Sequence, residues 1–338
     1  MARYHSSLAH SAYIDLRRSL QDEAVTQIRG NVVLAKRNGR GYWYDTYRVG
    51  NSVQKTYIGE DSAELRERIA RTTELKKNAK LRQTDRSRLV RLLRTEGITG
   101  VDTTTGSLLS ALAMSGVFRL GGTLVGTIAF RLYEGELGIR LPTDETTETN
   151  DLDIAAFEQL SLALAQTDAA DVNKALADLD FEAVPGLSPR KFWRWKQTRG
   201  EMMVEFLTPS FDSEEGIRLL PALGVHAQAL HFLNFLIADP IKAAVPYRSG
   251  VLVQIPAPER FAVHKLIVAD RRQGGPDALK SIKDRRQAAF LIEVLAQDRP
   301  DELREAWEDA RNRGPRWRER LDRSLARMPD TAKLLATL

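Results

Sequence analysis

The hydrophobic pattern of this chain changes its period twice within the first hundred residues, which predicts a small module of mixed secondary structure. Apolar residues recur every three or four positions over residues 11–28, and this spacing predicts an amphipathic helix. After Gly30 the period becomes two, and turn signals at 38–39 and 50–51 divide the stretch into segments of strand length. We therefore expect three short antiparallel strands near residues 32–34, 42–48 and 53–59, followed by a helix over 62–95.

The same hundred residues carry a strong excess of positive charge. They contain 20 Lys and Arg against 11 Asp and Glu, whereas the rest of the chain contains 30 against 34. This asymmetry favours a basic arm that meets a polyanion, although basic residues can also simply solubilise a long helix. Tyr42, Trp43 and Tyr44 lie among basic residues on the expected sheet, as in sheets that contact RNA or DNA, although such aromatics can also serve only to pack a small sheet on its helix. Alternation places Trp43 and Tyr47 on one face of the second strand. The other face carries Tyr42, Tyr44, Thr46 and Arg48.

The middle of the chain alternates between strand-like and helix-like segments, and its end is helical. We expect a strand region at 118–125, a helix at 126–137, a polar loop at 143–150 and a strand at 151–154. The later expected elements are helices at 157–165 and 170–179, a hairpin at 194–197 and 202–207, a strand at 252–255, and helices from 259 to the end. The organisation predicted from these elements is an N-terminal basic module (1–100), a mixed core (101–225) and a mainly helical C-terminal domain (226–338).

Composition excludes several classes of protein. The chain has 338 residues, 43% of them apolar, and no cysteine, which excludes disulfides, thiolate metal sites and a cysteine nucleophile. No apolar run reaches the length of a membrane span, so we expect a soluble cytoplasmic protein with no membrane partner. The sequence also lacks the phosphate-binding loop of P-loop NTPases and the motifs of zinc proteases and serine hydrolases.

Two aspartates form the most suggestive pattern for chemistry. Asp151 and Asp153 stand two residues apart on the expected strand, with Leu152 and Ile154 between and after them. On a strand, residues i and i+2 point to the same face, so both carboxylates project together. Their mutual repulsion would be relieved by a divalent cation such as Mg²⁺.

Three further features strengthen this prediction. Gly126 and Thr127 open a helix directly after an apolar strand, where free N–H groups and the helix dipole can bind phosphate. Glu205 stands among apolar residues of another expected strand and could share a metal with the aspartates. Lys265 lies beside apolar positions of a helix and could reach a triphosphate as a point charge.

In this order the features resemble the DNA-polymerase-β-type nucleotidyltransferase superfamily. The resemblance is carried by residues 124–130, 137–140, 150–155, 204–209 and 258–266. More narrowly, the chain resembles a bacterial nucleotidyltransferase-fold family that is related at a distance to the nucleotidyltransferase toxins of abortive-infection systems. The resemblance spans roughly residues 107–295. It implies an α+β fold, with a small mixed-sheet nucleotidyltransferase core and a helical C-terminal domain beside the N-terminal three-stranded sheet and basic helix.

The resemblance also implies an activity. Such an enzyme moves a nucleoside monophosphate from an NTP to an acceptor hydroxyl and releases pyrophosphate, with Mg²⁺ or Mn²⁺ as cofactor. It implies that Asp151 and Asp153 hold both metal ions, and that Glu205 completes the acceptor-side metal site and helps to deprotonate the hydroxyl. Gly126 and Thr127 would cradle the β- and γ-phosphates, and Lys265 would neutralise the leaving pyrophosphate. The basic module favours an RNA acceptor, such as a tRNA end, while a protein side chain or a small molecule stays open as the acceptor.

Two alternatives belong to other classes of protein. Glu205 stands where the superfamily more often has Asp, which keeps open a catalytically inactive scaffold that binds nucleic acid or acts in regulation. A purely structural helical protein does not explain three carboxylates in apolar strands. The charged run 283–286 favours a solvated helix face over a phosphate site.

Overall fold

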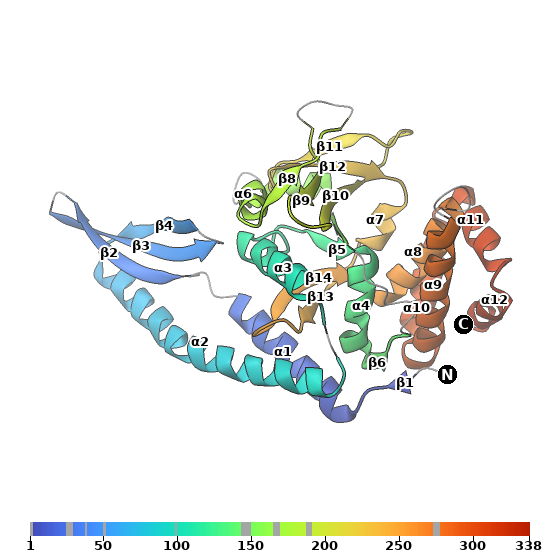
Figure 1. Ribbon diagram of the computed structural model, residues 1–338, viewed down its shortest axis with the longest axis horizontal. Helices are drawn as coiled ribbons and strands as arrows, with labels where there is room; N and C mark the ends of the chain where they lie inside the picture. The colour runs from blue at the N-terminus through green and yellow to red at the C-terminus, as the bar shows by residue number, and fades with distance from the viewer. Residues whose placement is uncertain are drawn as a thin grey trace.

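The computed structural model describes residues 3–24, 30–37, 39–49, 52–98, 100–142, 150–164, 170–186, 191–272 and 278–338. Figure 1 shows an extended N-terminal arm, a central sheet with its helices, and a group of C-terminal helices. The α+β fold class predicted from the sequence is confirmed. None of the helices within the described ranges is long and apolar enough to cross a membrane.

The N-terminal arm, by which we mean the strands β2, β3 and β4 together with α2, has the predicted elements. The strands form an antiparallel sheet in the order β2-β3-β4: β2 (Asn31–Arg37), β3 (Arg40–Val49) and β4 (Ser52–Glu60). Helix α2 (Ala63–Thr95) is capped by the Ser62 hydroxyl and has 33 residues, which gives it a length of about 50 Å. Its C-terminal part packs through Val90 and Leu93 on α1 (Ser7–Ala24), and its other end carries the sheet away from the body (Figure 1). Residues 25–28 of the first expected helix and the two turns at 38 and 50–51 lie outside the described residues.

The central sheet is mixed, and β10 lies in its middle. Its strand order is β11-β12-β10-β7-β5, with β9 also paired to β10 and β8 paired to β9. Strand β10 runs parallel to β7 and β12, whereas the other pairs are antiparallel. The strands are β5 (Thr123–Val125), β7 (Asp151–Ala155), β8 (Phe181–Ala183), β9 (Arg194–Gln197), β10 (Met203–Pro209), β11 (Ile217–Leu220) and β12 (Val225–Leu230). The expected hairpin of β9 and β10 is confirmed.

Short helices and two small strand pairs surround this sheet. The helices are α3 (Thr103–Ser115), α4 (Gly126–Leu137), α5 (Glu158–Leu164), α6 (Val172–Ala177) and α7 (Leu233–Leu236). Strand β1 (Arg3–Tyr4) pairs with β6 (Ile139–Arg140), and β13 (Pro240–Val245) forms a hairpin with β14 (Val251–Pro256). The expected strand region at 118–125 is a strand only from Thr123, because Gly116 and Gly121 adopt positive φ and hold the preceding residues in turns.

Five helices follow the hairpin: α8 (Pro258–Arg271), α9 (Ala278–Asp298), α10 (Pro300–Asn312), α11 (Pro315–Leu325) and α12 (Pro329–Ala336). Proline opens all of them except α9, because its fixed φ suits a first helical position that needs no N–H partner. One continuous hydrophobic cluster extends from Val101 to Leu335. The central sheet and the C-terminal helices therefore share one core.

Helix α1 fastens the arm to the body through a buried polar contact. The Tyr13 hydroxyl donates to Glu136 Oε1 at 2.5 Å and accepts the Ala244 N–H at 3.0 Å. Arg17 pairs with the same carboxylate, and a Cβ at Gly135 would lie 2.3 Å from the Tyr13 ring. Glu136 lies in the last turn of α4, the helix that begins at Gly126, so α1 is packed directly on α4.

We predict that Tyr13→Phe lowers the free energy of unfolding by about 1–3 kcal/mol, because it leaves Glu136 Oε1 and the Ala244 N–H without their hydrogen-bond partner while Arg17 still pairs with Glu136 Oε2. Tyr133→Phe is the control, because that buried hydroxyl makes a single hydrogen bond, to the Pro256 carbonyl. Denaturant unfolding followed by circular dichroism measures both. A smaller loss for Tyr13→Phe than for Tyr133→Phe would show that α1 is not fastened in this way.

Candidate functional site

Strand pairing brings the three predicted carboxylates to one face of the central sheet. In the parallel pair of β7 and β10, Asp151 lies opposite Met203 and Asp153 lies opposite Glu205. Residues that lie opposite each other share a face, so Asp153 and Glu205 are neighbours across the strands and Asp151 lies one pleat away. The intervening residues face the core and are fully buried: Leu152, Ile154, Val204 and Phe206.

The tripeptide Asp-Leu-Asp occurs twice in this chain, and only the first copy lies on a strand. Asp178 and Asp180 form the second copy, which lies in the turn between α6 and β8. Sequence spacing alone therefore does not make the site; the apolar alternation around Asp151 and Asp153 does. The second copy offers a matched control for substitutions.

Gly126 makes room for the Asp153 carboxylate. It has a positive φ of 72°, and a Cβ there would lie 2.4 Å from Asp153 Oδ2. Val125, the last residue of β5, precedes Gly126 and lies opposite Asp153 of β7. Val125 is also the N-cap residue of α4, where its side chain makes no hydrogen bond. Asp153 thus lies at the N-terminus of α4, where the helix dipole favours negative charge, and Thr127 follows partly exposed in the first turn.

The carboxylates perturb one another electrostatically. Burial raises the pKa of Asp153 to about 7, and the charges of Glu205 and Asp151 add to this effect against Arg272 and Lys265. The pKa of Glu205 is also raised, first by burial, with Arg194 opposing and Asp151 reinforcing the shift. Negative charge is therefore crowded at this point of the sheet.

The donor set suits a hard divalent cation, because it consists of carboxylate oxygens whose repulsion a dication would relieve. The arrangement is not a closed metal cage: no group of three or more His, Cys, Asp or Glu within the described ranges is placed to hold a metal ion. Arg194 Nη1 lies 3.9 Å from Glu205 Oε1, and its guanidinium stacks over the Trp193 ring at 4.4 Å. Asp151 and Asp153 with Glu205 are the residues that could hold a metal once the carboxylates draw together.

Two cations, the buried Lys265 and the partly exposed Arg272, lie near the carboxylates. Lys265 Nζ is 2.5 Å from Asp284 Oδ1, and Arg272 Nη1 is 2.9 Å from Asp284 Oδ2. Asp284 is only 2% exposed, so the expectation of a solvated face for 283–286 is wrong at this position. Two cations share one carboxylate, which leaves one positive charge in excess. The same surroundings lower the pKa of the buried His264 to about 3, through burial first and then the charge of Lys265.

Sequence reasoning missed Arg272 and Asp284. Lys265 and Arg272 are seven residues apart and hence on one face of α8, and this spacing is the signal that could have paired them. The partner on α9 could not have been found, because residues 273–277 separate the two helices and only the fold brings them together. The site as observed joins the predicted Asp151, Asp153, Glu205 and Gly126 with the Lys265 group.

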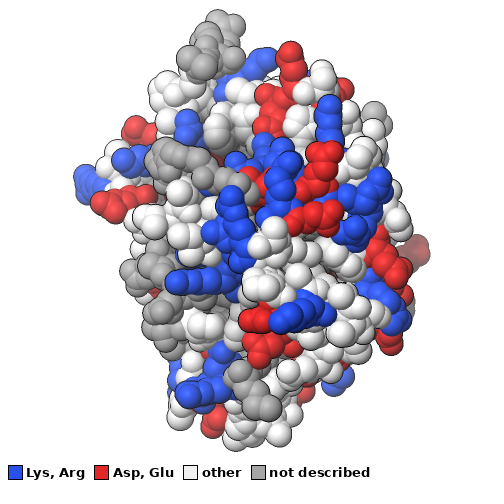
Figure 2. Space-filling model, turned by 90° about the vertical axis from the view of Figure 1, so that its right-hand side faces the viewer, with Lys and Arg blue, Asp and Glu red and all other residues white. Residues whose placement is uncertain are grey.

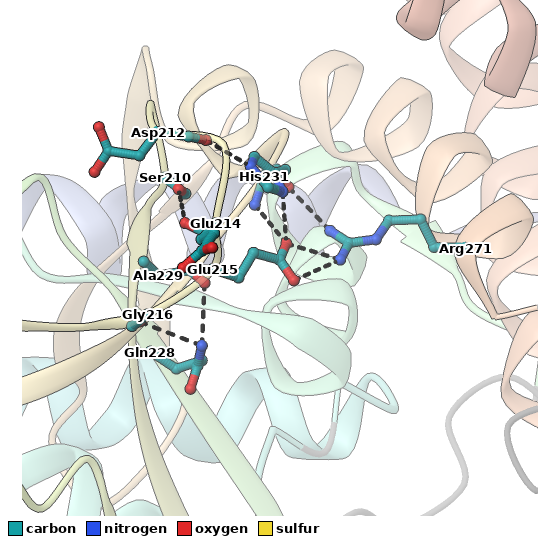
Figure 3. Close-up of polar contacts among 9 residues, drawn as sticks. All are labelled: Ser210, Asp212, Glu214, Glu215, Gly216, Gln228, Ala229, His231 and Arg271. Carbon is teal, nitrogen blue, oxygen red and sulfur yellow. Dashed lines mark hydrogen bonds and ion pairs between the residues drawn. The ribbon is translucent and has the colours of Figure 1, made fainter. Parts of the chain in front are cut away.

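The C-terminal end of α8 is held by a second polar cluster, drawn in Figure 3. Arg271 Nη2 contacts both oxygens of Glu215 at 2.7 and 2.9 Å, and Glu215 also accepts the His231 backbone N–H at 2.8 Å. His231 Nε2 lies 2.9 Å from the Asp212 carbonyl oxygen. These contacts tie the 210–216 segment after β10 to the helix that carries Lys265.

Ion pairs hold helix α11 to the same end of α8. Asp270 is buried and pairs with Arg320 and Arg323 at 2.7 and 2.9 Å. Figure 2 shows basic and acidic side chains interspersed over the face of the molecule at the right-hand side of Figure 1. The charges of these helices largely neutralise one another.

Comparison with known proteins decides the family. Residues 103–312, well over half of the chain, match the family described as nucleotidyltransferase. The chain belongs to this nucleotidyltransferase family. Residues 13–67 match a domain family of unknown function (DUF6788), which covers part of α1, the three strands of the arm and the start of α2.

Other similarities are remote. A crystal structure of an antigenic nucleotidyltransferase-like protein from Paracoccidioides brasiliensis is 14% identical, with a TM-score of 0.40 over 70% of this chain and 95% of that chain. No curated protein matches the chain. The family assignment therefore depends on the match over residues 103–312.

The raised pKa of Asp153 predicts a pH-dependent stability. Its folded pKa of about 7 exceeds its ordinary value of 3.8, so the folded state holds this proton more tightly and stability falls as pH rises between these values. At about 1.4 kcal/mol per pKa unit, the loss is at most on the order of 4 kcal/mol. We expect Asp153→Asn to exceed the melting temperature of the parent by more at pH 8 than at pH 5, when divalent cations are absent, because only part of the loss has occurred at pH 5.

Thermal unfolding at both pH values measures this effect. Asp180→Asn, at an exposed position of the second Asp-Leu-Asp copy, should follow the parent at both. Equal melting temperatures for Asp153→Asn and the parent at pH 8 would contradict charge crowding.

Proposed function

We propose that this chain is a metal-dependent enzyme that transfers a nucleoside monophosphate from an NTP to an acceptor hydroxyl, with RNA, such as a tRNA end, as the acceptor. The observation that carries the proposal is the meeting of Asp151, Asp153 and Glu205 on one face of β7 and β10, at the N-terminus of α4. The family match supports the reaction class. The positive charge of the first hundred residues supports the choice of RNA.

Each part of the site has a role in this reaction. The acceptor oxygen forms a bond to the α-phosphorus of the NTP. The bond between the α-phosphorus and the oxygen that bridges it to the β-phosphate breaks, and pyrophosphate leaves. Asp151, Asp153 and Glu205 would hold divalent cations, which when bound supply Lewis-acid stabilisation to the attacking and leaving oxygens. Glu205 accepts the proton of the acceptor hydroxyl, because its raised pKa makes it a better base than an ordinary carboxylate.

The remaining residues act on the phosphates. The backbone N–H groups at Gly126 and Thr127 lie in the first turn of α4, whose N-cap residue makes no side-chain hydrogen bond, and they bind the β- and γ-phosphates. Lys265 neutralises the charge that develops on pyrophosphate. The buried Asp284 pairs with both Lys265 and Arg272 and so holds them side by side, with one net positive charge for the group.

A second function is favoured by the contact of Arg194 with Glu205 and by the open arrangement of the carboxylates. In that case the protein is a catalytically inactive nucleotidyltransferase-fold scaffold that binds nucleic acid or acts in regulation. The two functions differ in metal-coupled NTP affinity. Only the enzyme should bind an NTP more tightly when Mg²⁺ or Mn²⁺ is present.

The transfer reaction can be tested with α-labelled NTPs, Mg²⁺ or Mn²⁺ and total RNA. We expect the parent protein to label RNA, and Asp151→Asn/Asp153→Asn to reduce labelling on the order of a hundredfold or more. Asp178→Asn/Asp180→Asn alters the second copy of the same tripeptide and should label RNA as the parent does. Equal labelling by the parent and the Asp151/Asp153 variant would remove the proposal.

A further inference from the structure

The three-stranded sheet of the arm has one face that packs on α2. Trp43 lies on this face and donates its indole N–H to Asp61 at 2.9 Å, just before α2 begins. A Cβ at Gly59, opposite Trp43, would lie 2.9 Å from the Leu65 side chain of α2. Asp45 is buried on the same face and accepts the Gly30 N–H at 2.7 Å. The side chains of this inward face therefore make contacts within the arm.

The opposite face points away from α2 and combines aromatic rings with cations. The pairing register places Val33 opposite Tyr44, Thr46 opposite Lys55, and Arg48 opposite Val53. Lys55 Nζ lies over the Tyr44 ring, 6.0 Å from its centroid, and Val53 is 64% exposed. We call this surface the outward face and define it by six residues: Val33, Tyr42, Tyr44, Arg48, Val53 and Lys55.

The charges of the sheet are almost all positive. Residues 31–60 contain five basic residues and only two acidic ones. Of these two, Asp45 is buried on the inward face, and Glu60 lies opposite Tyr42 at the end of β4, where it pairs with Arg40 at 3.5 Å. The outward face around Tyr44, Arg48 and Lys55 thus offers a ring and cations, and the one carboxylate beside Tyr42, at the edge of this face, is paired with Arg40. This arrangement suits a polyanion that also has flat rings.

The position of the sheet limits what this polyanion can be. The sheet lies at the end of α2, on a different element from the carboxylates of β7 and β10 (Figure 1). A ligand that contacts both sheets must extend from one to the other, as a polymer can. Tyr42 and Tyr44 are partly exposed. A ring that reaches the surface can stack on an unpaired base, whereas the bases of a duplex are already stacked on one another.

We propose that the outward face binds single-stranded nucleic acid, with Tyr42 and Tyr44 stacking on bases while Arg48 and Lys55 contact phosphates. That the bound strand is the acceptor rests on the function proposed above; the binding itself does not. Tyr42 and Tyr44 are binding residues and take no part in the transfer chemistry.

Binding is tested with the full chain and fluorescent single-stranded RNA of mixed sequence, by fluorescence anisotropy. Tyr42→Ala/Tyr44→Ala should weaken binding by roughly 30-fold or more, or about 5-fold or more for each stacked base that is lost. Tyr42→Phe/Tyr44→Phe keeps the rings and should bind within about twofold of the parent. Arg48→Gln/Lys55→Gln should reduce the slope of log affinity against log salt by about 1.4, or about 0.7 for each phosphate that is no longer neutralised. Circular dichroism melting verifies that each variant is folded.

Several results would overturn the inference. One is an RNA affinity of the folded Ala variant equal to that of the parent. Another is a loss of RNA affinity in the Phe variant as large as that in the Ala variant. The third is tighter binding to duplex than to single-stranded RNA. Binding to vesicles of anionic phospholipid that depends on the same residues, without RNA binding, would assign the face to a membrane surface instead.

The inference and the proposed function can fail separately. Metal-coupled NTP binding, measured by calorimetry, should be the same in the parent and the Ala variant. If the parent shows none while the tyrosines still govern RNA affinity, the enzymatic function fails and the binding face stands. If the Ala variant labels RNA as the parent does and binds RNA with the same affinity, the inference about the outward face fails and the enzymatic function stands.

Discussion

The repulsion between carboxylates on two hydrogen-bonded strands is the constraint around which this protein is built. A parallel register fixes Glu205 beside Asp153, and the pleat adds Asp151, so the backbone holds three negative groups on one side of the sheet. The neighbouring residues accommodate or offset this negative charge. Glycine at position 126 leaves room for the Asp153 carboxylate, and the N-terminus of α4 lies at Asp153. The buried Asp284 holds Lys265 and Arg272 nearby.

Much of this arrangement could be predicted from the sequence, because it depends on local patterns. The alternation around Asp151 and around Glu205 identified both strands, and the helix at 126–137 was predicted with its observed bounds. The register between the two strands is a long-range property, and residues 151 and 205 are too far apart in sequence for a pattern to reveal it. The same holds for Asp284, whose charged neighbours made it look like a solvated residue although the fold buries it.

The elements missed by sequence analysis share a physical cause. Strands β1, β6 and β8 have only two or three residues, too few for a period of two to be recognised. Strand β12 reads Val-His-Ala-Gln-Ala-Leu, whose small and polar residues give a weak signal, yet its pairing with β10 buries Val225, Ala227 and Ala229. Tertiary pairing decides such strands, whereas long amphipathic helices are decided by their own spacing.

The central claim is that the crowded carboxylates form a site for a divalent cation, and calorimetric titration with Mn²⁺ tests it most directly. A cation that binds to Asp153 must displace the proton which its pKa of about 7 retains near neutral pH. Titrations at pH 6.5, in two buffers with different ionisation enthalpies, should therefore show binding to the parent with release of a proton, and neither binding nor release in Asp153→Asn. Binding of Mn²⁺ without proton release, or with the same affinity in Asp153→Asn, would contradict the account.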